Sequence, residues 1–234
     1  MLLLNPITIL VAAAVIPALI LLYEVYKIDR LEKESGRLLR GLVLKGIVAT
    51  ALAVITEKIG IAILGTLFPT DSFIYYVFLM YAVVGLSEEG FKYLLLRLTT
   101  WNSPEFNCRF DGVVYAVFVA LGFALWENIS YVFSYGLGTA LVRAVTAVPG
   151  HACFGVFMGV WYGLAKKQQL WGQEDLSVVS RTVAVVLPVL IHGTYDLLAT
   201  MGNTWIFIIF IAVMFAISFA TIKKQSRQDH YLER

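Results

Sequence analysis

Charged residues are scarce in this chain. Lysine, arginine, aspartate and glutamate make up 15% of its 234 residues, whereas hydrophobic residues make up 59%. The mean hydropathy is +0.79. This composition excludes an ordinary soluble globular domain, whose surface needs more polar side chains than this sequence supplies. The chain is therefore expected to be an integral membrane protein.

Other features are also scarce or missing. The two cysteines, Cys108 and Cys153, are expected at different depths of the membrane, so no disulfide is expected. No internal repeat or low-complexity segment divides the chain, which favours one domain over residues 1–234. The net charge of +2 comes from loops, without a basic stripe interleaved with aromatics, so no nucleic-acid partner is expected.

Long apolar stretches, by contrast, are abundant. A helix needs about 20 apolar residues to cross a bilayer, and the sequence predicts an all-α, polytopic bundle of about seven transmembrane helices. The first stretch has no basic segment before it and is expected to remain in the protein as an anchor. The seven stretches cover residues 2–23, 42–67, 73–98, 112–133, 141–165, 182–199 and 205–222.

Lysine and arginine gather in alternate connections of this bundle. The connections near 68–72, 134–140 and 200–204 contain none. Because basic loops face the cytoplasm in most membrane proteins, we expect the N-terminus outside and the C-terminus inside. The basic segments are 24–40, 97–109, 166–181 and 223–234.

Two glutamates and a lysine interrupt the third apolar stretch. An ionised side chain near the bilayer centre costs ~2.5–3.5 kcal/mol on insertion scales, so it marks a functional site by default. On a helix, Lys92 lies four residues after Glu88 and three after Glu89. We expect the lysine to contact one carboxylate and leave the other free. An ion pair that only helps the helix to cross the membrane explains one glutamate, but not two.

Glu127 and Asn128 end a further apolar stretch. Gly112 and Gly122, earlier in that stretch, permit close approach of neighbouring helices. We expect Glu127 to point into the bundle, although a glutamate near a helix end can also be interfacial. Asn128 can serve as a plain hydrogen-bonding bridge between helices.

Two histidines lie beside prolines that loosen helical hydrogen bonding. His151 follows Pro149, with Arg143 two turns earlier, and His192 follows Pro188. A single intramembrane histidine is more often a packing residue than a ligand. Asp196, one turn after His192, can accept the proton of its ring and fix the tautomer.

The second apolar stretch carries Lys45, Glu57 and Lys58. Lys45 is close enough to the cytoplasmic interface to extend its ammonium into water. Glu57 can pair with Lys58 or mark a break in the helix. We expect these three residues to be structural.

The charges of the polar site leave two alternatives open. Four carboxylates face two cations, an excess of two negative charges that a divalent metal ion or protonation can neutralise. Glutamate and histidine suit zinc, whose catalytic sites use three protein ligands and a water. The sequence has no HExxH or GxSxG motif, so a metal site must be assembled from separate helices.

These residues resemble the PrsW family of intramembrane proteases, within the CaaX protease and bacteriocin-processing (CPBP) superfamily. The resemblance covers residues 85–196. It rests on four motifs: Glu88-Glu89-Gly90-Phe91-Lys92, Phe110-Asp111-Gly112 with Glu127-Asn128, Arg143 with His151, and His192-Gly193-Thr194-Tyr195-Asp196.

The resemblance implies hydrolysis of a membrane-bound protein, such as an anti-sigma factor, in the cytoplasmic membrane of a bacterium. Glu88 or Glu89 would be the general base, beside Lys92. The predicted zinc ligands are Glu127, His151 and His192, with Asp196 behind His192 and with Arg143 or Asn128 assisting the oxyanion. The CaaX-protease relatives have histidine in place of Glu127, so a metal-free mechanism stays open. The cut is expected in the outer half of the membrane.

Two other classes are compatible with buried polar residues. One is a non-catalytic scaffold similar to the seven-helix subunit of gamma-secretase, and the other is a proton-coupled transporter. The second glutamate favours hydrolysis over a scaffold, because packing needs no second carboxylate. The absence of inverted repeats disfavours a transporter.

Overall fold

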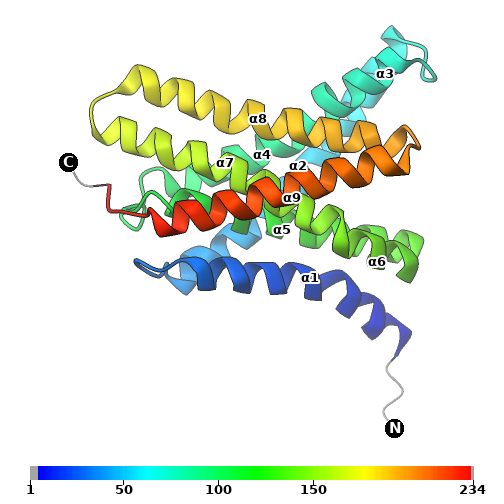
Figure 1. The fold of residues 1–234 in the computed structure, drawn as a ribbon. Helices are drawn as coiled ribbons and strands as arrows, with labels where there is room; N and C mark the ends of the chain where they lie inside the picture. Colours follow the sequence, from blue (N-terminus) through cyan, green and yellow to red (C-terminus); the bar gives the residue numbers. More distant parts are fainter. Residues whose placement is uncertain (1–4, 233–234) are drawn as a thin grey trace.

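The structure is a computed structural model that describes residues 5–232, and these residues form a helical bundle without a strand (Figure 1). The prediction of an all-α fold is confirmed. The helices are α1 (Pro6–Ile28), α2 (Gly36–Leu67), α3 (Phe73–Phe78), the π-helix η1 (Leu79–Gly85), α4 (Leu86–Thr100), α5 (Asp111–Tyr135), α6 (Leu137–Val145), α7 (Ala147–Leu170), α8 (Glu174–Thr200) and α9 (Thr204–Arg227).

Six spans in the described part of the chain are long and apolar enough to cross a membrane: α1, α2, α5, α6 with α7, α8 and α9. The remaining predicted stretch, 73–98, is helical, but it is divided among α3, η1 and α4. Helix α2 runs unbroken past Glu57, so of the two alternatives for this residue the break in the helix does not occur. Helices α2 and α8 begin at Gly36 and Glu174, before their predicted apolar stretches, because their first turns include charged residues.

The basic connections lie together at one end of the bundle. The loops after α1, α4 and α7 and the C-terminal end of α9 are at the left in Figure 1, and the loops after α2, α5 and α8 are at the right. Hydrogen bonds connect the loops at this basic end: Lys166 donates to the Trp101 carbonyl at 2.8 Å, and Asn107 donates to Glu32 at 3.1 Å. The arrangement agrees with the predicted alternation of loops. Which end faces the cytoplasm stays a prediction.

Helix α5 occupies the centre of the bundle. In its most apolar window 78% of the residues are buried, against 17% in α1 and in α9. Glycine explains how two helices approach it so closely. A Cβ atom at Gly122 would lie 2.2 Å from the Val43 carbonyl oxygen of α2, and one at Gly112 would lie 2.6 Å from the Gly163 nitrogen of α7. The predicted close approach at these two glycines is confirmed.

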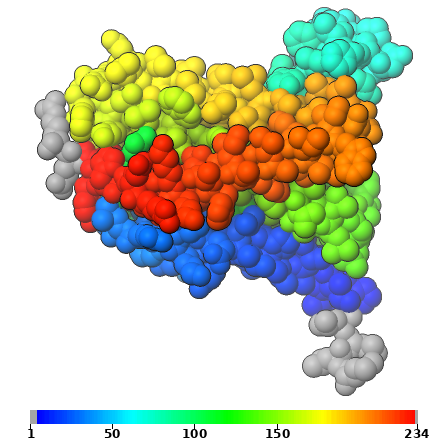
Figure 2. Space-filling view, in the orientation of Figure 1, coloured from blue at the N-terminus to red at the C-terminus, as the bar shows by residue number. Residues whose placement is uncertain are grey.

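The outer helices show an apolar face suited to lipid. Trp205, Ile209 and Phe219 of α9 are exposed, and α9 crosses the face of the molecule seen in Figure 2. The same view shows the segment around α3 projecting beyond the other helices. Helix α9 therefore presents an apolar face on the outside of the bundle.

The π-helix η1 packs directly on α8. A Cβ atom at Gly193 would lie 2.6 Å from the Tyr81 ring, and one at Gly85 would lie 3.1 Å from the Val189 carbonyl oxygen. The hydroxyl groups of Tyr81 and Thr194 are 2.8 Å apart. Short π-helical segments often occur at functional sites. Here the segment brings the first turn of α4 against the histidine-bearing part of α8.

Candidate active site

The two glutamates of α4 share one lysine. The Lys92 ammonium donates to Glu89 at 2.7 Å and to Glu88 at 3.2 Å, and all three side chains are buried. The prediction that Lys92 contacts one carboxylate and leaves the other free is therefore wrong. The helix places both carboxylates within reach of the long lysine side chain, because the i,i+3 and i,i+4 positions lie on one face. The ammonium also lies 3.9 Å from the centre of the Phe123 ring.

Lys92 also links α4 to α7. Its Nζ atom is 3.1 Å from Nδ1 of His151, and Nε2 of His151 is 2.8 Å from a carboxylate oxygen of Glu127 on α5. An ammonium has no lone pair, so Nδ1 accepts the hydrogen bond. The neutral His151 ring then carries its proton on Nε2 and donates it to Glu127.

Helix α6 contributes the cation that partners Glu127. The Arg143 guanidinium donates from Nη2 to Glu127 at 2.7 Å and from Nε to Asn128 at 3.1 Å. The Asn128 amide donates in turn to the Ala14 carbonyl of α1 at 2.8 Å. Arg143 also lies 4.0 Å from the centre of the Tyr131 ring. Asn128 is therefore a bridge that fixes Arg143 between three helices.

The second histidine lies on α8. Nδ1 of His192 is 2.9 Å from Glu89, and Nε2 is 3.4 Å from Asp196 and 3.9 Å from Glu88. Because Glu89 only accepts hydrogen bonds when it is ionised, Nδ1 is the protonated nitrogen of a neutral His192 ring. The lone pair of Nε2 then points toward Glu88 and Asp196. The Phe154 ring stacks on His192 with 4.6 Å between centroids.

A cavity of about 760 Å³ opens onto one side of this network. Glu88 lines it, whereas Glu89 and Lys92 lie behind its wall. Residues near the ends of α5 and α8, including Tyr131 and Thr200, also line it. The cavity therefore extends toward the end of the bundle that the basic loops avoid. Its other ionisable lining residues are Glu57, Glu127, Arg143, His151, His192 and Asp196.

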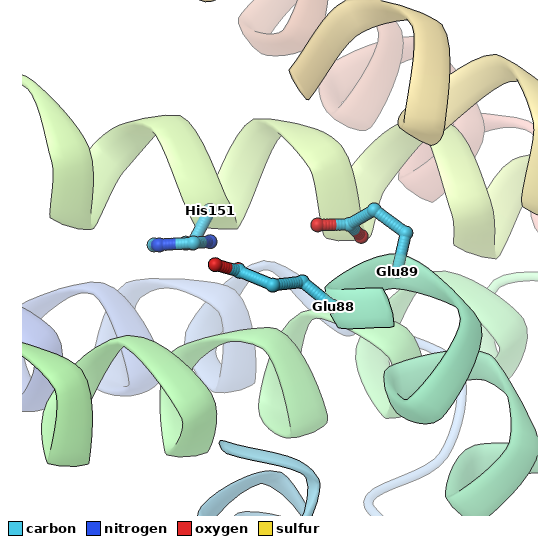
Figure 3. A group of neighbouring side chains, drawn as sticks. All are labelled: Glu88, Glu89 and His151. Atoms are coloured by element: carbon cyan, nitrogen blue, oxygen red, sulfur yellow. The ribbon is translucent and has the colours of Figure 1, made fainter. Parts of the chain in front are cut away.

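Two sets of side chains offer atoms that could bind a metal ion. Glu88, Glu89 and His151 each offer a ligand atom within 4.8 Å of the others (Figure 3). Lys92 contacts all three, so its ammonium already occupies the position that a metal cation would take. This first set does not fit a metal ion while the lysine is charged.

The predicted set of Glu127, His151 and His192 has the donor chemistry that zinc prefers. His192 suits the role best, because Glu89 holds its Nδ1 proton and Nε2 faces the cavity beside Glu88 and Asp196. His151 can bind through Nε2 only after the Lys92–His151 pair loses a proton, and metal binding commonly releases protons in this way. These ligands stay a prediction.

The sequence did not predict one acidic residue of the cavity wall, Glu57 of α2. Its carboxylate lines the cavity and interacts electrostatically with Glu127, His192 and Asp196. The presence of lysine at the next position led to the expectation of a local pair. Adjacent positions on a helix do not face each other. The spacing of Glu57 and Lys58 therefore already indicated that they would not form a pair.

Comparison with known proteins gives consistent relatives. Residues 34–222 match the family described as PrsW family intramembrane metalloprotease. The chain is 30% identical over 217 residues to Protease PrsW of Oceanobacillus iheyensis, covering 92% of this chain and 95% of that protein. It is 31% identical over 219 residues to Protease PrsW of Halalkalibacterium halodurans, covering 92% and 94%. It is 35% identical over 130 residues to Protease PrsW of Bacillus subtilis, covering 56% and 58%. No solved structure matches the chain significantly.

Proposed function

Because this chain belongs to the PrsW family of intramembrane metalloproteases, we propose that it cleaves a single-pass membrane protein with a water molecule activated by Glu88. The substrate class is an anti-sigma-factor-like protein, and the location is the cytoplasmic membrane of a bacterium. The relatives named as proteases support a membrane protease. The position of Glu88 between the cavity and Lys92 supports its assignment as the base.

Glu88 and Glu89 have different surroundings, which separates their roles. Glu88 reaches the cavity, where a water and a substrate carbonyl can meet, and its contact with Lys92 is the longer of the two at 3.2 Å. Glu89 is fully buried and holds both Lys92 and His192. Glu88 therefore takes the proton of the attacking water, while Glu89 fixes the lysine and the histidine.

Arg143 supports the developing oxyanion. Two of its donors hold Glu127 and Asn128, and a guanidinium has five N–H donors in all, so donors remain for a substrate oxygen at the cavity wall. Donors placed where charge develops stabilise a transition state strongly. Asn128 acts by holding Arg143 in this position.

The same residues can place a metal ion beside the water. Glu127, His151 and His192 would hold zinc, which when bound supplies Lewis-acid chemistry and an acidic water. Glu89 orients the His192 ring through the opposite nitrogen, Nδ1, while Asp196, 3.4 Å from Nε2, would lie beside the ion. Glu88 keeps its task as proton acceptor with or without the ion.

The cavity favours a cut in the outer half of the membrane. Its lining extends to Tyr131 and Thr200, close to where α5 and α8 end opposite the basic loops. An extended substrate segment can enter from that end together with water. Mass spectrometry of the fragments tests the position, and a scissile bond on the cytoplasmic side would contradict it.

The central experiment compares Glu88→Gln with Glu89→Gln on a membrane-tethered substrate. Removal of a general base costs about 10²–10⁴-fold in rate, so Glu88→Gln should lose at least about 10²-fold in kcat with normal folding. Glu24→Gln, at an exposed position of α1, serves as the matched control. If Glu88→Gln folds and cleaves at the wild-type rate, Glu88 is not the base. If wild-type protein binds the substrate without cutting it, the scaffold function is favoured instead.

A further inference from the structure

Glu57 is an acidic residue of the cavity that the proposed reaction does not use. It lies in the interior of α2, 21 positions after the first residue of that helix, Gly36, and its carboxylate lines the cavity. Its Oε1 atom is buried and has no hydrogen-bond partner among the described residues. A buried carboxylate oxygen without a partner is costly in a membrane, and a cation that enters the cavity from outside the chain can supply that partner.

The other acids of the cavity already have partners. Arg143 donates to Glu127 at 2.7 Å, Lys92 donates to Glu88 at 3.2 Å, and Asp196 lies 3.4 Å from His192. The carboxylate of Glu57, by contrast, forms no hydrogen bond through Oε1 with any of the described residues.

Lys58 does not supply the missing partner. It is the adjacent residue on α2 and is exposed on the outside of the helix, and adjacent helical positions do not face each other. The carboxylates of Glu127 and Asp196 repel that of Glu57, whereas Lys92 and His192 attract it without forming a hydrogen bond or ion pair with it. A neutral N–H group relieves hydrogen bonding but not this repulsion, whereas a cation relieves both.

We propose that Glu57 is a specificity residue, whose carboxylate binds a lysine or arginine side chain of the substrate segment in the cavity. This inference rests on the proposed protease function. Glu57 of α2 and the proposed base, Glu88 of α4, line the same cavity, so the basic side chain would be bound in the cavity that also holds the attacking water. Attraction between the two charges is strong in this low-dielectric setting.

The test uses one tethered substrate with Lys, Gln or Glu substituted singly at each position around the cleaved bond. Wild-type protein should cleave one lysine-bearing substrate about 10-fold more efficiently than its glutamine counterpart, equivalent to about 1.4 kcal/mol. Glu57→Gln should remove this preference through KM, and leave kcat for the glutamine substrate within about twofold. Glu57→Asp should retain part of the preference, and Glu57→Lys should shift it toward the glutamate substrate. Lys58→Gln is the matched control and should keep the wild-type preference.

A second readout separates this inference from the reaction itself. Fluorescence anisotropy measures binding of the Lys and Gln peptides to the Glu88→Gln protein, with and without the added Glu57→Gln change. Tighter binding of the lysine peptide that depends on Glu57 supports the inference even when cleavage fails. An unchanged lysine preference in Glu57→Gln overturns it, as does an equal loss of kcat on all substrates or a loss of bound zinc, either of which would place Glu57 in the catalytic machinery.

Discussion

At the scale of single residues, Lys92 holds the site together. Its ammonium contacts Glu88, Glu89 and His151, which come from two helices. The i,i+3 and i,i+4 spacing predicted a contact within α4, although not that Lys92 contacts both carboxylates. The contact with His151 was not predicted, because it depends on how α4 and α7 pack, and residue spacing carries no information about that packing.

Replacing Lys92 should destabilise the protein. Lys92→Met leaves two buried carboxylates without their cation, and breaking a buried ion pair on one side costs about 3–5 kcal/mol. We expect a large drop in thermal stability in detergent, and partial recovery when Glu89→Gln is added. Lys58→Met changes an exposed lysine and should leave stability near wild type. A Lys92→Met protein as stable as wild type would contradict the role assigned to this ion pair.

Metal content tests the predicted ligands without relying on activity. Purified wild-type protein should contain close to one zinc ion, and the double variant His151→Ala, His192→Ala should contain little. His230→Ala alters the remaining histidine, which lies in the C-terminal tail near Lys167, and should retain the metal. Elemental analysis measures all three. Full activity after exhaustive chelation, with no metal in the protein, would favour the metal-free mechanism.

At the scale of elements, the sequence predicted helices well and their interruptions poorly. Apolar length identified six spans, since crossing a bilayer requires it. The π-helix η1 lies in an apolar stretch that reads as one continuous helix. Its cause is tertiary, because Gly85 and Gly193 allow η1 and α8 to pack with backbone nearly in contact. A single sequence does not reveal which glycines face each other.

Gly193→Ala should therefore disturb the site through η1. The added Cβ would lie 2.6 Å from the Tyr81 ring, and overpacking of this kind costs about 1–3 kcal/mol. We expect lower thermal stability and a loss of activity, because the contact between Glu89 and His192 depends on the same packing. Gly41→Ala on α2 meets nothing within 4 Å and is the control. Equal activity of the two variants would show that η1 can move without harm to the site.

At the scale of the whole molecule, the orientation of the bundle can be measured directly. Arg30→Cys and Asp71→Cys place a thiol at exposed positions in loops at opposite ends, while Cys108 and Cys153 are buried. An impermeant thiol reagent should label the Asp71→Cys protein in intact cells and the Arg30→Cys protein only after permeabilisation. The reverse pattern would invert the topology and move the cavity to the cytoplasmic side.

Membership of the wider CPBP superfamily stays a prediction.

The packing at the basic end of the bundle should weaken as pH rises. Burial raises the pKa of Glu34 from 4.5 to about 7, against the hydrogen bond that Tyr115 donates to it at 2.7 Å. Its other charged neighbours are Asp111, Glu105 and Asp29. A raised carboxyl pKa stabilises the folded protein fully below the unfolded value, and this stability is lost as pH rises through about 7. Thermal melts between pH 4.5 and 7.5 should show a smaller decline for Glu34→Gln than for wild type and for the exposed-site variant Glu24→Gln. An identical decline in all three proteins would contradict this.

The chain of hydrogen bonds from Arg143 through Glu127, His151, Lys92 and Glu89 to His192 passes through five different helices. Such a chain holds only while these helices keep their relative tilt. Lipid tails shorter or longer than the apolar spans force helices to tilt or the bilayer to deform. A change in bilayer thickness is thus expected to change the geometry of this site, and the activity of the protein should depend on the acyl-chain length of the lipids around it.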